Sequence, residues 1–313
     1  MTNIAIVGSG SIGASWAIVF AAAGHRVRLW DPGEGVARAA LTSIRPQLAE
    51  LLSAGVIDTM PDEILSRMSV AETMAHAVET ADYIQENGPE KLDIRRQLFV
   101  ELDNLAHPNA IIASSTSGMA PSSFTDHLTR KDRCLVAHPA NPPHLLPLVE
   151  LCPSPWTSVE TMQRAQALMV SAGRQVAALK HEAEGFLLNR LQGALLAEAF
   201  RIVAAGIADP DDIDTVMKHA LGRRWSFMGP FETVDLNAPG GISDFCARYG
   251  SLYENLQRQM PPREWDAELV ATVAEARRAD LSISDIPDRQ AWRDRRLMSL
   301  AAYLQTQPNP RDK

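Results

Sequence analysis

A histidine and a glutamate are the side chains of this sequence best suited to acid–base chemistry. His138 directly follows the apolar segment 135–137, and Glu150 lies twelve residues later in a second apolar segment, 148–151. A carboxylate beside an imidazole holds the ring in one tautomer and stabilises the cation that forms when the ring takes up a proton. The two side chains could act together as a general base. By type and spacing alone, a histidine at the end of a strand is more often structural, and the sequence does not show that the two meet.

Hydroxyl and amide side chains form a second group of candidates. Residues 114–117 are Ser-Ser-Thr-Ser and follow the apolar segment 110–113. If that segment is a parallel strand, hydroxyls at its carboxyl end face the crevice where such sheets bind ligands. A serine-rich turn is an equally good interpretation. Asn189 is a polar residue in the largely apolar, helix-like segment 186–196, where it could face water, cap a neighbour or serve a site.

The glycine pattern G-x-G-x-x-G at positions 8–13 matches the fingerprint of a dinucleotide-binding turn. It follows the strand-like segment 4–7 and opens the helical segment 14–23. The first glycine permits a tight turn, the second lets the backbone approach a pyrophosphate, and the third lets helix and strand pack closely. The diphosphate then rests on amide N–H groups at the helix N-terminus. The pattern alone is weak, but its place between strand and helix makes it specific. The residues expected to bind the dinucleotide here are Gly8, Gly10, Ser11, Ile12 and Gly13.

An acidic residue, Asp31, follows the second strand-like segment, 26–30, and lies 18 residues after Gly13. Its carboxylate can hydrogen-bond the hydroxyls of an adenosine ribose there. The same charge repels a 2′-phosphate, and no Arg or Lys follows until Arg38. The sequence therefore predicts NAD rather than NADP as the cofactor. Taken alone, Asp31 could also be a turn residue before Pro32.

Strand-like and helical segments alternate through the first half of the chain. Further strands are expected at 83–85, 110–114 and 134–137, edge strands at 149–151 and 176–179, and helices at 37–52, 62–80 and 91–105. Such alternation predicts an open α/β sheet. After about residue 184 no segment alternates like a strand, and Asp209-Pro210 is a strong helix start. We therefore predict an α/β fold in which a Rossmann-type parallel sheet domain, residues 1–184, precedes an all-helical domain, residues 185–313.

Composition restricts the class of partner. The chain has 313 residues, of which 46% are hydrophobic and 22% charged, with a formal net charge of −8. The negative balance argues against a nucleic-acid partner. Three cysteines without a CxxC pair, and no metal-ligand spacing, favour a reduced compartment and no metal. The uncharged segment 1–24 is interrupted by four glycines and is too polar for a membrane span. A soluble cytoplasmic protein with no membrane partner is expected.

Taken together, these segments resemble the 3-hydroxyacyl-CoA dehydrogenase family, and within it the lambda-crystallin branch, whose enzymatic activity is that of an L-gulonate 3-dehydrogenase. The matching segments are IVGSG (6–10), STS (115–117), HPANPP (138–143), PLVEL (147–151), GFLLNRLQ (185–192), GPFET (229–233) and WRD (292–294). They extend through almost the whole chain, and those near its end distinguish the branch from the enzymes that act on acyl-CoA. So many matches in the same order make the resemblance specific.

The resemblance implies roles for particular residues. It assigns the catalytic pair to His138 and Glu150, the ligands of the substrate oxygen to Ser117 and Asn189, and contacts on the nicotinamide side to Glu90 and Arg95. Ser115, also expected to bind the cofactor, stands where the acyl-CoA enzymes usually have Asn, which puts a CoA substrate in doubt. Members of the family are typically dimers joined through the helical domain, so a homodimer is expected here.

The implied reaction is the NAD-dependent oxidation of the 3-hydroxyl of a small hydroxy acid, with L-gulonate to 3-dehydro-L-gulonate as the first candidate. An acidic protein that binds a small carboxylate needs a local cation, and an arginine can pair both carboxylate oxygens. Arg224 is the expected anchor because it matches the branch and Arg223 does not; solvated or interface salt bridges explain both arginines equally well. The alternatives are a 3-hydroxyacyl-CoA or carnitine 3-dehydrogenase, or a non-catalytic crystallin-like protein that retains only NAD binding.

Overall fold

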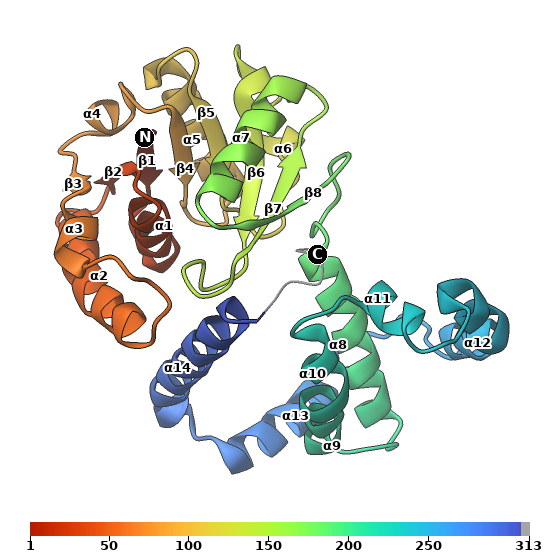
Figure 1. Cartoon of the computed structure of the whole chain (residues 1–313). Helices are drawn as coiled ribbons and strands as arrows, with labels where there is room; N and C mark the ends of the chain where they lie inside the picture. The colour runs from red at the N-terminus through yellow and green to blue at the C-terminus, as the bar shows by residue number, and fades with distance from the viewer. Residues whose placement is uncertain (308–313) are drawn as a thin grey trace. The chain divides into compact units, whose positions relative to one another are not determined.

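The computed structural model describes residues 1–307, and its contacts divide the chain into two compact units (Figure 1). The first unit comprises residues 1–189 and the chain from Asp294 onward, and the second comprises residues 190–293. The contacts therefore group residues 185–189 and the C-terminal segment with the sheet. The domain boundary after residue 184 stays a prediction.

An eight-stranded sheet organises the first unit. Its strands are β1 (Asn3–Val7), β2 (Arg26–Trp30), β3 (Met68–Val70), β4 (Tyr83–Glu86), β5 (Ile111–Ser114), β6 (Cys134–Pro139), β7 (Leu148–Pro153) and β8 (Gln175–Ala178). They lie in the order β3-β2-β1-β4-β5-β6-β7-β8, and every neighbouring pair is parallel except β6 and β7, which are antiparallel. Central strands such as β1 are almost wholly apolar because both faces of the sheet are covered. The predicted Rossmann-type α/β fold is confirmed.

Helices cover the two faces of this sheet, and one hydrophobic cluster fills each interface. The helices are α1 (Ser11–Ala22), α2 (Val36–Ser53), α3 (Pro61–Leu65), α4 (Met74–Val78), α5 (Leu92–Leu105), α6 (Ser122–Thr125), the 3-10 turn η1 (Lys131–Arg133) and α7 (Val159–Ser171). One cluster holds Trp16 of α1 and Ile44 of α2. The other holds Phe99 of α5 and Phe124 of α6. The glycine turn and the carboxyl ends of the strands are therefore fixed on a rigid base.

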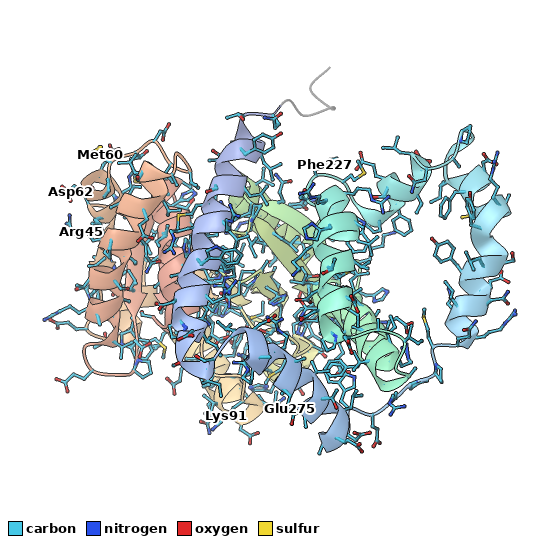
Figure 2. The ribbon with its side chains drawn as sticks, turned by 90° about the horizontal axis from the view of Figure 1, so that it is seen from below. Arg45, Met60, Asp62, Lys91, Phe227 and Glu275 are labelled. Atoms are coloured by element: carbon cyan, nitrogen blue, oxygen red, sulfur yellow. The ribbon has the colours of Figure 1, made fainter. Side chains whose placement is uncertain are left out.

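The segment 62–80 is not the single helix that we predicted from the sequence. It contains α3, strand β3 and α4. Strand β3 pairs in parallel with β2, and the Thr73 side chain caps α4 by accepting a hydrogen bond from the His76 amide at 3.1 Å. An ion pair joins Arg45 of α2 to Asp62 of α3 (Figure 2). The prediction was wrong because a strand of three residues is too short to show an alternating pattern.

The second unit is built from helices, and no strand lies within residues 190–293. Its elements are α8 (Leu188–Ala204), which begins in the first unit, α9 (Pro210–Val216), the π-helical turn η2 (Met217–Leu221), α10 (Gly222–Trp225), α11 (Pro230–Asp235), α12 (Gly241–Arg258), α13 (Ala267–Asp280) and the 3-10 turn η3 (Ile283–Asp285). Helix α14 (Ile286–Gln305) leads back to the first unit, where its Met298 is buried. The all-helical second half is confirmed. Within residues 1–307 no helix is long and apolar enough to cross a membrane.

Candidate active site

His138 and Glu150 meet because their strands are antiparallel neighbours. The two residues are paired directly opposite each other in the register of β6 and β7. The His138 Nδ1 atom lies 2.8 Å from Glu150 Oε2, and the two residues are 6% and 1% exposed. No residue within 1–307 hydrogen-bonds the other ring nitrogen, Nε2. This leaves Nε2 available to a substrate while the carboxylate fixes the tautomer with hydrogen on Nδ1.

Backbone amides hold the other oxygen of Glu150. Glu150 Oε1 accepts hydrogen bonds from the amides of Leu187 at 2.7 Å and Leu188 at 2.8 Å. The preceding residues, Gly185 and Phe186, have φ angles of 72° and 52°, and this left-handed turn presents both amides to the carboxylate. A left-handed conformation is unfavourable for a bulky residue such as Phe and is common at functional sites.

Phe186 also packs against the base. Its buried ring lies 5.4 Å from the His138 ring, centroid to centroid. The sequence alone predicts no role for Phe186. The available signal was its position directly after Gly185 and before the predicted helix, where the chain has to change direction.

The pKa of the Glu150 carboxyl lies below its ordinary value of 4.5. Burial by itself raises this pKa, but the hydrogen bonds from His138 and from the amides of Leu188 and Leu187 outweigh it. Glu150 is therefore a carboxylate at neutral pH. It can stabilise the imidazolium that forms when His138 takes up a proton.

Ser117 and Asn189 are brought together in the first unit. Asn189 Nδ2 donates a hydrogen bond to the backbone oxygen of Ser117. The Ser117 hydroxyl and the Asn189 side-chain oxygen have no partner within residues 1–307, so both remain available to a ligand. Because Leu187 and Leu188 bind Glu150 and the next residue binds Ser117, the start of α8 links the two predicted groups.

Glu90 holds the Ser117 loop in place. Its Oε1 accepts the Ser117 amide at 2.6 Å, and its Oε2 accepts the Thr116 hydroxyl at 2.8 Å and Arg95 Nη1 at 2.9 Å. Burial raises the Glu90 pKa, but these bonds outweigh burial and bring it below its ordinary value. Arg95 is only 1% exposed and also pairs with the buried Glu86 at 3.2 Å. Arg95 is therefore enclosed and holds Glu90 in place, and the cofactor contacts of Glu90 and Arg95 stay predictions.

The glycine turn has the shape that a dinucleotide requires. A Cβ on Gly13 would lie 2.0 Å from the Gly8 oxygen, and one on Gly8 would lie 2.9 Å from the Asn87 carbonyl, so neither position has room for a side chain. A Cβ on Gly10 would meet nothing within 4 Å, which leaves its outer side open to a ligand. Ser11 then begins α1 and Ile12 packs partly against the core, so the helix N-terminus faces that open side.

Asp31 is anchored beside this turn. Its Oδ2 accepts the Ser9 amide at 2.7 Å and its Oδ1 accepts the Gly33 amide at 2.8 Å. The carboxylate is half-buried and retains lone pairs for a ribose hydroxyl. Turn, helix and acid together fit NAD. Within residues 1–307 no three His, Cys, Asp or Glu side chains come together as metal ligands.

Arg224 belongs to the second unit, where it follows the π-helical turn. Its side chain is half-buried and its Nε is enclosed without a hydrogen-bond partner within residues 1–307, whereas Arg223 is exposed. A π-helical turn is rare and is frequent at functional sites. The two neighbouring arginines thus differ in environment.

A mostly parallel sheet, a glycine turn shaped for a dinucleotide, an acid beside that turn and a buried His–Glu pair together define an NAD-dependent dehydrogenase that acts on a CH–OH group. Two family models match the chain: the NAD binding domain of 3-hydroxyacyl-CoA dehydrogenase over residues 3–182, and the C-terminal domain of 3-hydroxyacyl-CoA dehydrogenase over residues 185–280. The chain belongs to the 3-hydroxyacyl-CoA dehydrogenase family, as its sequence motifs predict.

Individual relatives support the branch. The chain is 41% identical over 308 residues to a lambda-crystallin homolog of Bos taurus, covering 96% of this chain and 94% of that protein. It is 32% identical over 305 residues to an L-carnitine dehydrogenase of Pseudomonas sp, covering 97% and 94%. Among solved structures it resembles 5-formyl-3-hydroxy-2-methylpyridine 4-carboxylic acid 5-dehydrogenase, an NAD+-dependent dismutase, with a TM-score of 0.84, 25% identity and coverage of 98% and 100%. The predicted lambda-crystallin branch is thus confirmed.

Proposed function

We propose that the protein oxidises the 3-hydroxyl of a small hydroxy acid that carries a free carboxylate, with L-gulonate as the first candidate. The observation that carries the proposal is the buried His138–Glu150 pair, whose ring nitrogen Nε2 is available and whose carboxylate is held by two backbone amides. This arrangement is that of a general base with a fixed tautomer. A protein with a purely structural role would not require it.

Each of the site residues has a distinct role in the proposed reaction. His138 removes the hydroxyl proton at Nε2, and Glu150 stabilises the imidazolium that results. The Ser117 hydroxyl and the second N–H of the Asn189 side-chain amide donate to the substrate oxygen, and Glu90 fixes the Ser117 loop. The glycine turn and Asp31 hold NAD, which supplies a hydride acceptor when bound.

Two other substrates follow from the relatives. An L-carnitine dehydrogenase covers nearly the whole chain, and the family is named for 3-hydroxyacyl-CoA substrates. The test is a panel of L-gulonate, L-carnitine and a 3-hydroxyacyl-CoA with NAD, followed by the absorbance of NADH. We expect the highest kcat/KM with L-gulonate. Activity on CoA thioesters alone would contradict the free-acid proposal, and no activity on any hydroxy compound would favour a structural protein.

The cofactor preference should depend on Asp31. We expect a strong preference for NAD over NADP, and we expect Asp31→Asn to weaken it by about tenfold or more. Loss of the charge removes a ribose hydrogen bond and the repulsion of a 2′-phosphate, effects of about 1–3 kcal/mol. Asn keeps an oxygen for one of the two amides that Asp31 now binds, whereas Asp31→Ala would release both. Equal kcat/KM with NAD and NADP in the unmodified enzyme would refute this prediction.

The carboxylate of the substrate is expected to pair with Arg224. The Arg224→Met variant should raise the KM for a free hydroxy acid at least tenfold, because Met replaces the aliphatic part of the arginine side chain but removes the cation. Binding of NAD should be unchanged. Arg223→Met is the matched control, since Arg223 is the adjacent, exposed arginine. Equal KM values for the two variants would remove Arg224 as the anchor.

We also propose a cytoplasmic homodimer joined through the helical unit. None of the residues of α8 or α12 is buried within one chain. Large apolar side chains of this unit are exposed, among them Phe227 (Figure 2), Phe231, Leu236, Leu252 and Tyr253. Exposed apolar surface of this extent is typical of a protein interface. A sedimentation mass of a single chain would contradict the dimer.

A further inference from the structure

Five side chains beneath the glycine turn form one polar network, which we call the Ser115 network: Trp16, Tyr83, Gln85, Asn87 and Ser115. The Ser115 hydroxyl donates to Asn87 Oδ1 at 2.8 Å and accepts from Trp16 Nε1 at 3.0 Å and Gln85 Nε2 at 2.7 Å. A hydroxyl has one donor and two acceptor positions, so all three are used. Direct binding of NAD by this hydroxyl, as we predicted from the sequence, would require one of these bonds to break.

Gln85 extends the network to the strand that carries the base. Its Nε2 also donates to the Ala137 oxygen at 3.2 Å, and its Oε1 accepts the Tyr83 hydroxyl at 2.7 Å. Burial raises the pKa of Tyr83 well above its ordinary value, so this hydroxyl remains a donor. Strand β5 pairs with β6 only as far as Ser114 and Val136. The Ala137 oxygen lies one residue beyond the last β5–β6 pair, and its hydrogen-bond donor is the Gln85 side chain.

Gln85 binds the peptide group that joins Ala137 to His138, the proposed base. The oxygen of Ala137 and the nitrogen of His138 belong to one planar peptide unit, so a bond to the first fixes the second. His138 is held from its side chain by Glu150 and from its backbone by Gln85. Both atoms of the Gln85 amide are paired, and the residue is fully buried, so it has little freedom to move.

The other end of the network lies at the glycine turn, residues 8–13, where NAD is expected to bind. The backbone N–H of Asn87 donates to the Val7 oxygen at 2.8 Å. The backbone carbonyl of Asn87 is the group that leaves no room for a Cβ on Gly8. Trp16 lies on α1, the helix that begins at the glycine turn, and its ring stacks on Phe20 at a centroid distance of 5.2 Å. The network therefore joins the turn that receives NAD to the strand that presents the base.

We propose that the Ser115 network positions the catalytic base relative to the glycine turn, so that its members are positioning residues for turnover. The inference rests on the proposed function, because it takes His138 as the base. Misplacement of reacting groups by about 1 Å can lower a rate by about a hundredfold. Hydrogen bonds that only stabilised the fold would instead affect the melting temperature and leave turnover unchanged.

The test uses variants that remove one hydrogen bond at a time. Trp16→Phe removes the indole N–H but keeps an aromatic ring against Phe20. We expect kcat to fall about tenfold, with the KM for NAD changed less than about threefold, and a larger deuterium isotope effect as hydride transfer becomes more rate-limiting. Ser115→Ala should act similarly. The double variant should be no slower than Ser115→Ala, because both substitutions break the same unit.

Trp156→Phe is the matched control. Trp156 Nε1 donates to the Thr125 hydroxyl at 3.1 Å, which is the same kind of indole–hydroxyl bond in the same unit but outside the network. It should lower kcat by less than about twofold. Ser115→Thr keeps the hydroxyl and should restore most of the turnover that Ser115→Ala loses.

A second readout does not depend on a substrate. The ring resonance of His138, assigned by its absence in His138→Gln, should move in the NMR spectrum of Trp16→Phe and of Gln85→Met, but not in that of Trp156→Phe. An unmoved resonance in folded variants, with only the melting temperature lowered, would overturn the positioning role. A protein that oxidised no hydroxy acid would contradict the proposed function, and the resonance would still decide whether the network holds His138.

Discussion

His138→Gln is expected to lower kcat by about a hundredfold or more while NAD binding persists. Gln has a side chain of similar polarity, but it cannot accept the hydroxyl proton, so the step loses a positioned general base. The base lies on β6 and faces Glu150, whereas the glycine turn and Asp31 belong to other segments. Loss of the imidazole should therefore lower kcat without weakening the binding of NAD.

The measurement is kcat at neutral pH together with the Kd for NAD, because loss of a general base lowers the rate and leaves binding of the cofactor intact. His76→Gln is the control, because His76 is an exposed histidine of the same unit that lies on α4. If His138→Gln kept turnover within a few-fold of the unmodified enzyme, another residue would be the base.

The site could be predicted from residue types, but its geometry could not. A histidine and a glutamate at the ends of apolar segments indicate a base, yet their contact arises from the antiparallel register of β6 and β7. The sequence predicted residues 149–151 as an edge strand, whereas β7 lies inside the sheet between β6 and β8. Strand order depends on long-range packing, which a local pattern does not encode.

The roles of supporting residues were hardest to foresee. Nothing in the local pattern around Phe186 shows its positive φ angle or its contact with His138. Arg95 was predicted beside the cofactor, but only the structure shows that burial encloses it behind Glu90. Ser115 is similar, since its three partners come from different parts of the chain. Short local motifs identify groups that do chemistry; groups that hold them are identified by tertiary contacts.

Glu150→Gln should also lower kcat by about a hundredfold or more, and the structure gives a specific reason. Glu150 Oε1 accepts two backbone amides, so the oxygen of the introduced glutamine side chain must take that place. The NH2 group of that glutamine would then face His138 Nδ1, which would have to accept a hydrogen bond. The ring would carry its hydrogen on Nε2, the atom that must receive the substrate proton. The variant would hold the base in the wrong tautomer as well as lose the charge that stabilises the imidazolium.

Three measurements check this account. The ring nitrogen shifts of His138 should show the hydrogen on Nε2 in Glu150→Gln and on Nδ1 in the unmodified enzyme. The double variant with His138→Gln should be no slower than either single variant, because the two residues act as one unit.

The stability of the fold should also depend on pH. The pKa of Glu150 in the folded protein lies below its ordinary value of 4.5. Its carboxylate therefore stabilises the fold above pH 4.5, and this stabilisation is lost as the pH falls through the folded pKa. The melting temperature of Glu150→Gln should therefore lie below that of the unmodified enzyme at neutral pH, and the difference should narrow below pH 4.5. A constant difference across this range, or a His138 ring that keeps its hydrogen on Nδ1, would show that Glu150 does not set the state of the base.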